Sequence, residues 1–176
     1  MKRKAIFFTF LMFSMNAFTT EQIPDLLIIG KDTVFLKTFP LEQLEMKSRP
    51  FGFWTKEKSF ASTACWRSYK AIWRIIDNKL FLERIVECHN RPGEENIIEL
   101  FERNGIKFQE KEGRIFADWC TLDLYRQTFS SRGTRWERDK IFLYDRPLRR
   151  RNAREIILQI ENGVITINRL QRPAAN

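Results

Sequence analysis

Side chains that could act as nucleophiles or bases are few in this chain of 176 residues. The single histidine, His89, follows Cys88, and a thiol beside an imidazole suggests a nucleophile–base pair. Both residues lie in a segment expected to be extended, where adjacent side chains point to opposite faces. The two groups would not meet, so we expect a surface histidine at a strand end.

Carboxylate and metal chemistry are equally poorly supported. Asp118 and Asp123 could form a carboxylate pair, but a solvated strand edge explains them as well. One histidine and three widely spaced cysteines form no Cys-x-x-Cys or His-x-x-x-His pair, which disfavours structural zinc. The sequence holds no Gly-rich phosphate loop, Gly-x-Ser-x-Gly motif or EF-hand loop. We therefore predict a protein that is not an enzyme, with no catalytic, cofactor-binding or metal residues.

The cysteines indicate structure rather than reactivity. Cys65 and Cys88 could form a disulfide in an oxidising compartment, with strand twist or a bulge bringing them within reach. The alternative is that all three cysteines are small buried hydrophobic residues. Cys120 would remain free and is expected to be buried.

Positive charge is concentrated in residues 126–154, which contain ten basic and three acidic side chains in a chain of net charge +9. This Arg-rich stretch predicts a surface for an acidic protein or an anionic envelope component. A solvated loop with local ion pairs is the alternative. Nucleic acid is disfavoured, because no recognised nucleic-acid fold signature is present. The candidate anion-binding or partner-binding residues are Arg135, Arg138, Arg146, Arg149, Arg150 and Arg151.

A second candidate contact is the aromatic segment of Phe51, Phe53 and Trp54. It could anchor a protein partner. The general tendency of aromatic side chains to be buried favours a different role, in which this loop folds onto the sheet and covers it.

The N-terminus has the pattern of a secretory signal peptide. Lys2, Arg3 and Lys4 precede an uncharged run from Ala5 to Phe18. This run is too short to span a bilayer, which requires about 20 residues. We assign residues 1–19 to the signal peptide and residues 20–176 to one domain with no membrane span. The expected location is the periplasm or the extracellular space.

The elements that must position these residues are mostly hairpins. The composition, 43% hydrophobic and 30% charged, is that of a soluble globular domain. Asp77-Asn78 and Asn162-Gly163 predict turns between strands at 65–76 and 79–88, and at 155–160 and 164–170. With Ile76 opposite Lys79, the apolar face would include Val86 and Cys88. A helix is expected at 95–104 and a helical turn at 40–46. The predicted fold class is α+β, mainly antiparallel β, as a hairpin-rich meander sheet with one or two short helices.

A resemblance adds to this interpretation. The run from Ala64 to Leu82, which begins Ala-Cys-Trp-Arg-Ser-Tyr, resembles a group of uncharacterised bacterial proteins with a Cys-Trp-Arg-x-Tyr motif. Similar pieces occur at residues 23–27, 39–42, 116–119 and 155–163. The resemblance implies a small β-rich domain and a bacterial source, and it transfers no activity. Ser68 stands where such proteins tend to have glycine.

These observations together predict an exported, non-enzymatic binding protein of a bacterial envelope. Its partner would be an acidic or amphipathic protein or envelope component, contacted through the Arg-rich stretch. The alternative is an immunity-type inhibitor of a toxin or hydrolase, for which the positive charge requires an acidic target.

Overall fold

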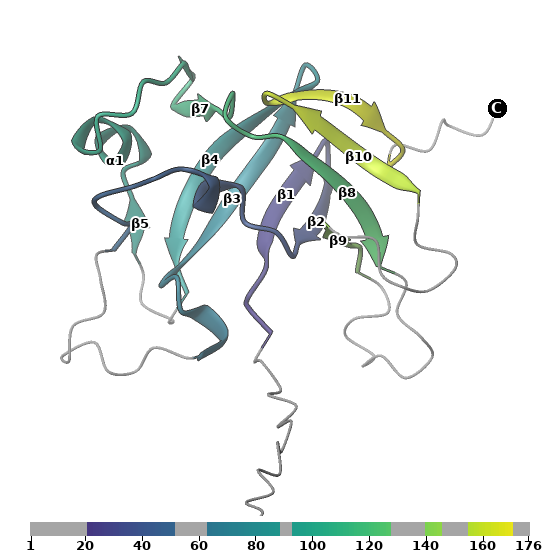
Figure 1. Cartoon of the computed structure of the whole chain (residues 1–176), viewed down its shortest axis with the longest axis horizontal. Coiled ribbons are helices and arrows are strands. Elements are labelled where there is room, and N and C mark those ends of the chain that lie inside the picture. The colour runs from purple at the N-terminus through teal and green to yellow at the C-terminus, as the bar shows by residue number, and fades with distance from the viewer. Residues whose placement is uncertain (1–20, 52–62, 89–92, 128–139, 146–154, 171–176) are drawn as a thin grey trace, which may run out of the picture.

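We use a computed structural model of the protein, shown in Figure 1, and describe its residues 21–51, 63–88, 93–127, 140–145 and 155–170. The strands are β1 Asp25–Ile29, β2 Asp32–Leu36, β3 Tyr69–Ile76, β4 Lys79–Glu87, β5 Glu94–Glu95, β6 Glu110–Lys111, β7 Arg114–Phe116, β8 Leu122–Gln127, β9 Phe142–Tyr144, β10 Ile156–Glu161 and β11 Val164–Asn168. In the described part of the chain they are accompanied by one α-helix, α1 (Ile97–Arg103), and two 3-10 helices, η1 (Pro40–Gln43) and η3 (Thr63–Cys65). The β-rich, mainly antiparallel class predicted from the sequence is confirmed.

The strands close into a barrel, so the predicted meander sheet is wrong. Eight strands follow one another in the order β4, β3, β1, β2, β9, β8, β10 and β11. The pairing of Val164 with Lys79 returns β11 to β4 and closes the ring. β1 pairs with β3, and β2 with β9, in parallel. Parallel neighbours need long crossovers, and hairpin signals between consecutive strands do not reveal them.

The hairpin of β3 and β4 contains the two longest strands of the barrel. Asp77 and Asn78 both have positive φ, as a two-residue turn requires, and Ile76 pairs with Lys79 as predicted. A bulge then shifts the register between Ile72 and Trp73. The extra residue on β4 turns Ile85, which is fully buried, toward the interior in place of Val86. The predicted inward position of Val86 is therefore wrong.

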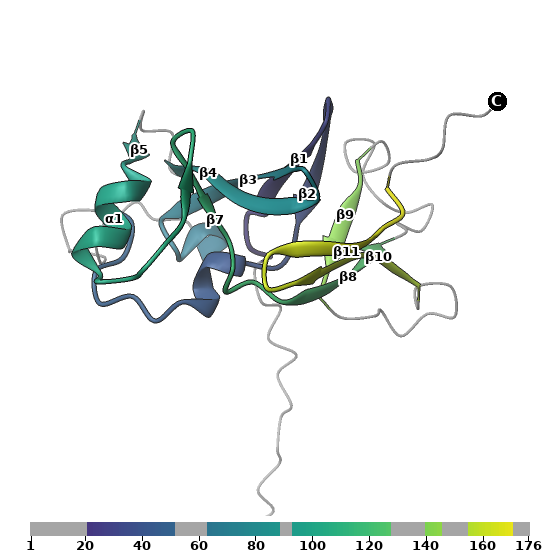
Figure 2. The ribbon, with the colours of Figure 1, turned by 90° about the horizontal axis from the view of Figure 1, so that it is seen from above.

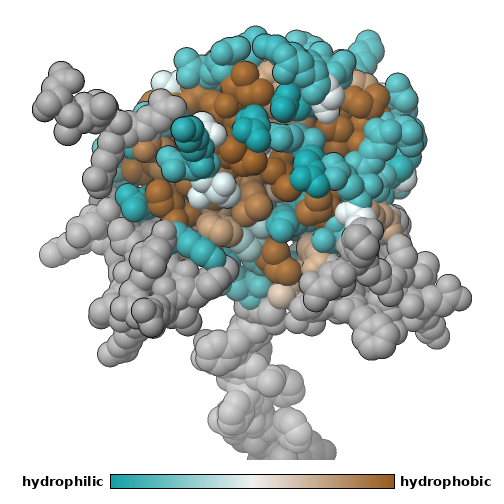
Figure 3. All heavy atoms as spheres, turned by 180° about the vertical axis from the view of Figure 1, so that it is seen from behind, coloured by the Kyte–Doolittle hydropathy of each residue, from teal (hydrophilic) through white to brown (hydrophobic). Residues whose placement is uncertain are grey.

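The core fills the barrel. Alternate residues of β1, β2 and β3 are buried, and Trp73 is the largest side chain among them. Figure 2 shows β1–β4 on one side of the interior and β8, β10 and β11 on the other. An eight-stranded barrel has an interior that side chains can fill completely, which fits this packing. On the outer face of β1–β4, Figure 3 shows apolar side chains interspersed with polar ones.

The helix α1 covers the barrel beside β5 and β7. Asn96 caps its N-terminus by accepting hydrogen bonds from the backbone N–H groups of Ile98 and Glu99. Leu100 and Phe101 point into the core and are fully buried. Gly105, at a φ of +67°, ends the helix as the sequence predicts.

Candidate functional site

The predicted Arg-rich contact lies almost entirely outside the described residues. This holds for Arg135, Arg138, Arg146, Arg149, Arg150 and Arg151. Of the ten basic residues, the structure describes Arg126, which is exposed, and Lys140, which is half-buried. The ammonium of Lys140 lies 5.0 Å from the ring centroid of Phe35.

The described strands show where the Arg-rich stretch joins the barrel. β8 is paired on one side with β9 and on the other with β10. Phe142, the first residue of β9, pairs with Gln127, and Ile156, the first residue of β10, pairs with Tyr125. Segments 128–139 and 146–154 thus join the sheet at positions next to the C-terminal half of β8.

The aromatic segment is described only at its first residue, because Phe53 and Trp54 lie outside the described residues. Phe51 is half-buried and packs against the core. Its backbone has a φ of +56°, and its N–H donates to Oε2 of Glu95 at 2.9 Å. The role of the aromatic segment as a partner contact stays a prediction.

The cysteines are arranged as one disulfide and one free thiol. Cys65 and Cys88 are bonded, with their Cα atoms 6.4 Å apart. This bond ties the turn before β3 to the end of β4, and it leaves Cys88 without a nucleophilic thiol. Cys120 is free and buried, and burial raises the pKa of its thiol to about 12. His89 lies outside the described residues.

The two carboxylates considered from the sequence, Asp118 and Asp123, lie exposed on the surface rather than in a cavity. Asp123 accepts a hydrogen bond at 2.9 Å from Nε2 of Gln159, which lies on the neighbouring strand β10. Among the described residues, no group of three or more His, Cys, Asp or Glu side chains could hold a metal ion.

The most unusual polar feature is a buried ion pair. Nη1 of Arg67 lies 3.0 Å from Oδ1 of Asp25, and both side chains are fully buried. The backbone N–H of Ala71 and the indole N–H of Trp73 also donate to the Asp25 carboxylate. The guanidinium lies 3.7 Å from the ring centroid of Phe39. Burial raises the pKa of Asp25, and the charge of Arg67 and these donors oppose that shift.

This pair holds the N-terminal strand in place. Nη2 of Arg67 donates to the carbonyl of Ile23, just before β1. Because the pair has no access to solvent, we interpret it as structural rather than as a reacting group.

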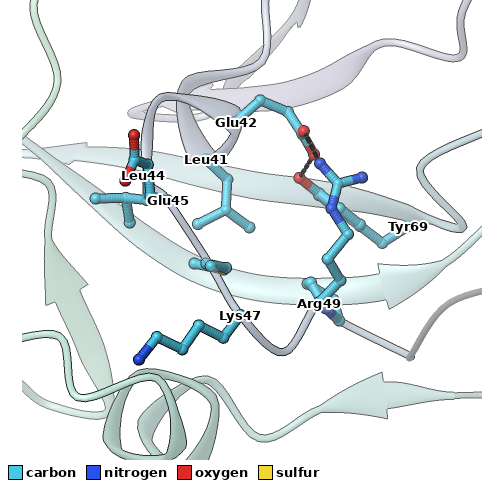
Figure 4. Close-up of a pocket in the computed structure, with 9 residues that line it drawn as sticks. Leu41, Glu42, Leu44, Glu45, Lys47, Arg49 and Tyr69 are labelled. Carbon is cyan, nitrogen blue, oxygen red and sulfur yellow. Dashed lines mark hydrogen bonds and ion pairs between the residues drawn. The ribbon is translucent and has the colours of Figure 1, made fainter.

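The described residues also line a cavity of about 410 Å³, shown in Figure 4. Eight of its nine lining residues come from the segment after β2, and Tyr69 of β3 is the ninth. Its apolar lining is Leu41, Leu44, Met46 and Pro50, and its charged lining is Glu42, Glu45, Lys47 and Arg49. The Tyr69 hydroxyl donates to Oε1 of Glu42 at 2.6 Å, and the Arg49 guanidinium pairs with Oε2. Burial and the Glu42 carboxylate raise the pKa of Tyr69, so its hydroxyl stays protonated.

The sequence predicts a helical turn at residues 40–46 but no cavity beside it. The cavity depends on where this segment lies against α1. The N–H and carbonyl of Ser48 both bond to the side chain of Asn104, at 2.8 Å each. No short-range pattern in the sequence indicates a contact across 56 residues.

Comparisons with protein-family models, curated proteins and solved structures found no match to this chain. Among the described helices, none is long and apolar enough to cross a membrane.

Proposed function

We propose that this chain is an exported, non-enzymatic binding protein that contacts an acidic partner of the bacterial envelope through the Arg-rich stretch. The observation that carries the proposal is the shared attachment of segments 128–139 and 146–154 around β8. Both segments therefore start and end on β8 or on a strand paired with β8, which favours one continuous basic surface. Such a surface attracts an acidic partner over a distance set by ionic strength.

Export is supported by the disulfide. Disulfides persist in oxidising compartments and are rare in the cytosol. The bond between Cys65 and Cys88 thus agrees with a signal peptide at residues 1–19.

Export is tested by expressing the full chain in a bacterium and fractionating the cells. We expect a periplasmic or extracellular protein whose mass lacks the first 19 residues and whose Cys65 and Cys88 resist alkylation. A full-length cytosolic protein with both thiols reactive would refute export.

Partner binding is tested by capture from an envelope fraction at low and high salt. The decisive variant changes Arg149, Arg150 and Arg151 to Glu. The matched control changes Lys31, Lys107 and Lys111 to Glu, which are exposed and lie outside the stretch. We expect an acidic component that is retained at low salt, released at high salt, lost with the arginine variant and kept with the control.

Other outcomes are equally clear. Equal losses with both triple variants would show only an effect of net charge and count against a specific surface. If the captured component is one stoichiometric enzyme that the chain inhibits, the immunity-type interpretation replaces the envelope one.

A further inference from the structure

The cavity beside Tyr69 lies away from β8, β9 and β10, the strands to which the Arg-rich stretch connects, and plays no part in the function proposed above. The segment that forms it is bonded to α1 and β5 through Asn104 and Glu95. Figures 1 and 2 show α1 and β5 on the opposite side of the molecule from β8, β9 and β10. Its chemistry can therefore be considered by itself.

The walls of the cavity are fixed before any ligand arrives. Ser48 is held by both of its backbone groups, and the N–H of Phe51 is held by the Glu95 carboxylate. Across the cavity, Glu42 is fixed by Tyr69 and Arg49 at once (Figure 4). A site whose side chains are already ordered loses less entropy on binding.

The polar groups of the cavity carry equal positive and negative charge and include both hydrogen-bond donors and acceptors. Two carboxylates and two cations line it, so the net charge is zero. Glu42 uses one acceptor site on each oxygen and retains others, and its bond uses one of the five N–H donors of Arg49. Glu45 and Lys47 add an exposed acceptor and an exposed donor at the edge. A ligand that both donates and accepts hydrogen bonds fits this set.

Apolar surface lies next to these groups. Leu41, Leu44 and Met46 line the cavity together with the charged residues. Beyond Arg49, the indole of Trp66 is 48% exposed, with the guanidinium carbon 5.3 Å from its ring centroid. An exposed indole offers a flat apolar surface with a polar edge.

We infer that this cavity binds a neutral saccharide of one or two rings. Each sugar hydroxyl donates and accepts, which suits Glu42 and Arg49 side by side, and the C–H face of a sugar ring packs on Leu44, Met46 or Trp66. The volume of about 410 Å³ is at the small end of ligand pockets, which span about 300–1,000 Å³.

Other ligand classes fit less well. A simple anion or cation would meet two favourable and two unfavourable charges around the same small cavity. A long acyl chain would bury the charged side chains of Glu42 and Arg49 against hydrocarbon, which is costly. Of these three classes, the saccharide is the one that uses both the polar and the apolar lining.

The test is a titration of the ¹⁵N-labelled folded protein followed by NMR. The probes are glucose, maltose, N-acetylglucosamine and its β-1,4-linked dimer, and the comparison ligands are leucine, acetate and phosphate. We expect at least one sugar to shift the backbone signals of residues 44–50 and the indole signal of Trp66. Shifts by leucine, acetate or phosphate with none by any sugar would overturn the proposal, as would no shift by any probe.

Variants link the binding to the cavity. Arg49→Met removes the N–H donors, and Trp66→Ala removes the indole surface; each should weaken sugar binding by about tenfold or more. Arg84→Met is the control, since this arginine does not line the cavity and is paired with Glu94 on the surface. Lys47→Gln changes an exposed side chain and keeps the fold, so a smaller loss is expected there. Unchanged affinity in both the Arg49 and Trp66 variants would refute the site.

The source of the sugar is a separate outcome. Co-sedimentation of the protein with insoluble envelope glycan, lost in Arg49→Met, would indicate the end of a glycan chain. Binding to the soluble sugars without co-sedimentation would indicate a free saccharide. Because none of these experiments involves residues 126–154, their failure leaves the proposed acidic partner unaffected.

Discussion

Asp25 and Arg67 form an ion pair 3.0 Å long that is completely closed to solvent. Removing two charges from water is costly, and such a pair persists only where further hydrogen bonds compensate. Here Ala71 and Trp73 donate to the carboxylate, and Ile23 accepts from the guanidinium. The pair therefore joins the start of β1 to the start of β3, which are parallel neighbours in the barrel.

The first prediction concerns the loss of one partner of this pair. Asp25→Asn leaves the guanidinium buried without a counter-charge, and this should lower the free energy of unfolding by about 3–5 kcal/mol. Glu94→Gln is the control, because the pair of Glu94 with Arg84 is half exposed on both sides. It should cost less than about 1 kcal/mol. Urea unfolding measures both; equal small effects would show that the buried pair is not needed for stability.

The second prediction concerns the disulfide. Cys65 and Cys88 are 23 residues apart, and a loop of that length stabilises the fold by about 3 kcal/mol in the chain-entropy model. The double variant Cys65→Ala, Cys88→Ala should lose about that amount in guanidinium unfolding. Dithiothreitol should destabilise the natural chain to a similar extent and leave the double variant unchanged. A reductant effect of equal size on both would assign the loss to something other than this bond.

The sequence predicts the local part of this fold well. Asp77-Asn78 and Asn162-Gly163 specify two-residue turns, and alternation along each strand then indicates which face is buried. The bulge opposite Ile72 is not encoded in that alternation, so the register beyond it was misassigned. Barrel closure depends on pairings between segments far apart, such as Leu26 with Ile72 and Phe35 with Phe142. No short-range pattern specifies them.

Of the two candidate sites, one follows from the local sequence and the other depends on contacts between distant residues. Charge counting finds the Arg-rich stretch, since charge is a property of composition. The cavity was missed, because it needs Glu42, Arg49 and Tyr69 to meet across a loop whose position is set by Asn104. A glutamate and an arginine seven residues apart have no spacing that marks a site.

The third prediction concerns the free thiol. Cys120 is buried and its thiol has a pKa of about 12, so only about one molecule in 10⁴ is ionised at pH 8. The folded protein should not react with a thiol-specific disulfide reagent at that pH. In guanidinium the unfolded protein should react once per chain, at Cys120, while the disulfide between Cys65 and Cys88 stays intact. Fast reaction of the folded chain would mean that the 117–120 segment opens readily.

The fourth prediction concerns acid. Hydrogen bonds from Arg74 hold the pKa of Glu83 below its ordinary value of 4.5. The unfolded chain therefore binds a proton here more readily than the folded one. The stabilisation by Glu83 is present above pH 4.5 and is lost as the pH falls through the lower pKa of the folded state.

Glu83→Gln removes that dependence. The difference in unfolding free energy between the natural chain and Glu83→Gln should shrink as the pH is lowered from about 6 to about 3. A difference that stays constant over this range would show that Glu83 titrates alike in both states.

The last prediction concerns the glycine at which the barrel closes. Gly163 has a φ of +77°, and a Cβ placed on it would lie 2.5 Å from the carbonyl oxygen of Ala117. Its N–H donates to Cys120, and its carbonyl accepts from Leu80 of β4. The turn between β10 and β11 is therefore clamped between two other backbone segments, beside the pairing of Val164 with Lys79.

Gly163→Ala should lower the free energy of unfolding through both the positive φ and the close contact with Ala117. A substitution at Gly113 measures the effect of the positive φ by itself. Gly113 has a φ of +74°, but a Cβ there would have no atom within 4 Å. Gly113→Ala should thus cost only the conformational term, about 1 kcal/mol. Gly163→Ala adds a clash with backbone, worth about 1–3 kcal/mol more, because the neighbouring strands must move apart. Equal destabilisation of the two variants in urea would show that this turn can shift freely, and the ring would then not depend on a close approach at Gly163.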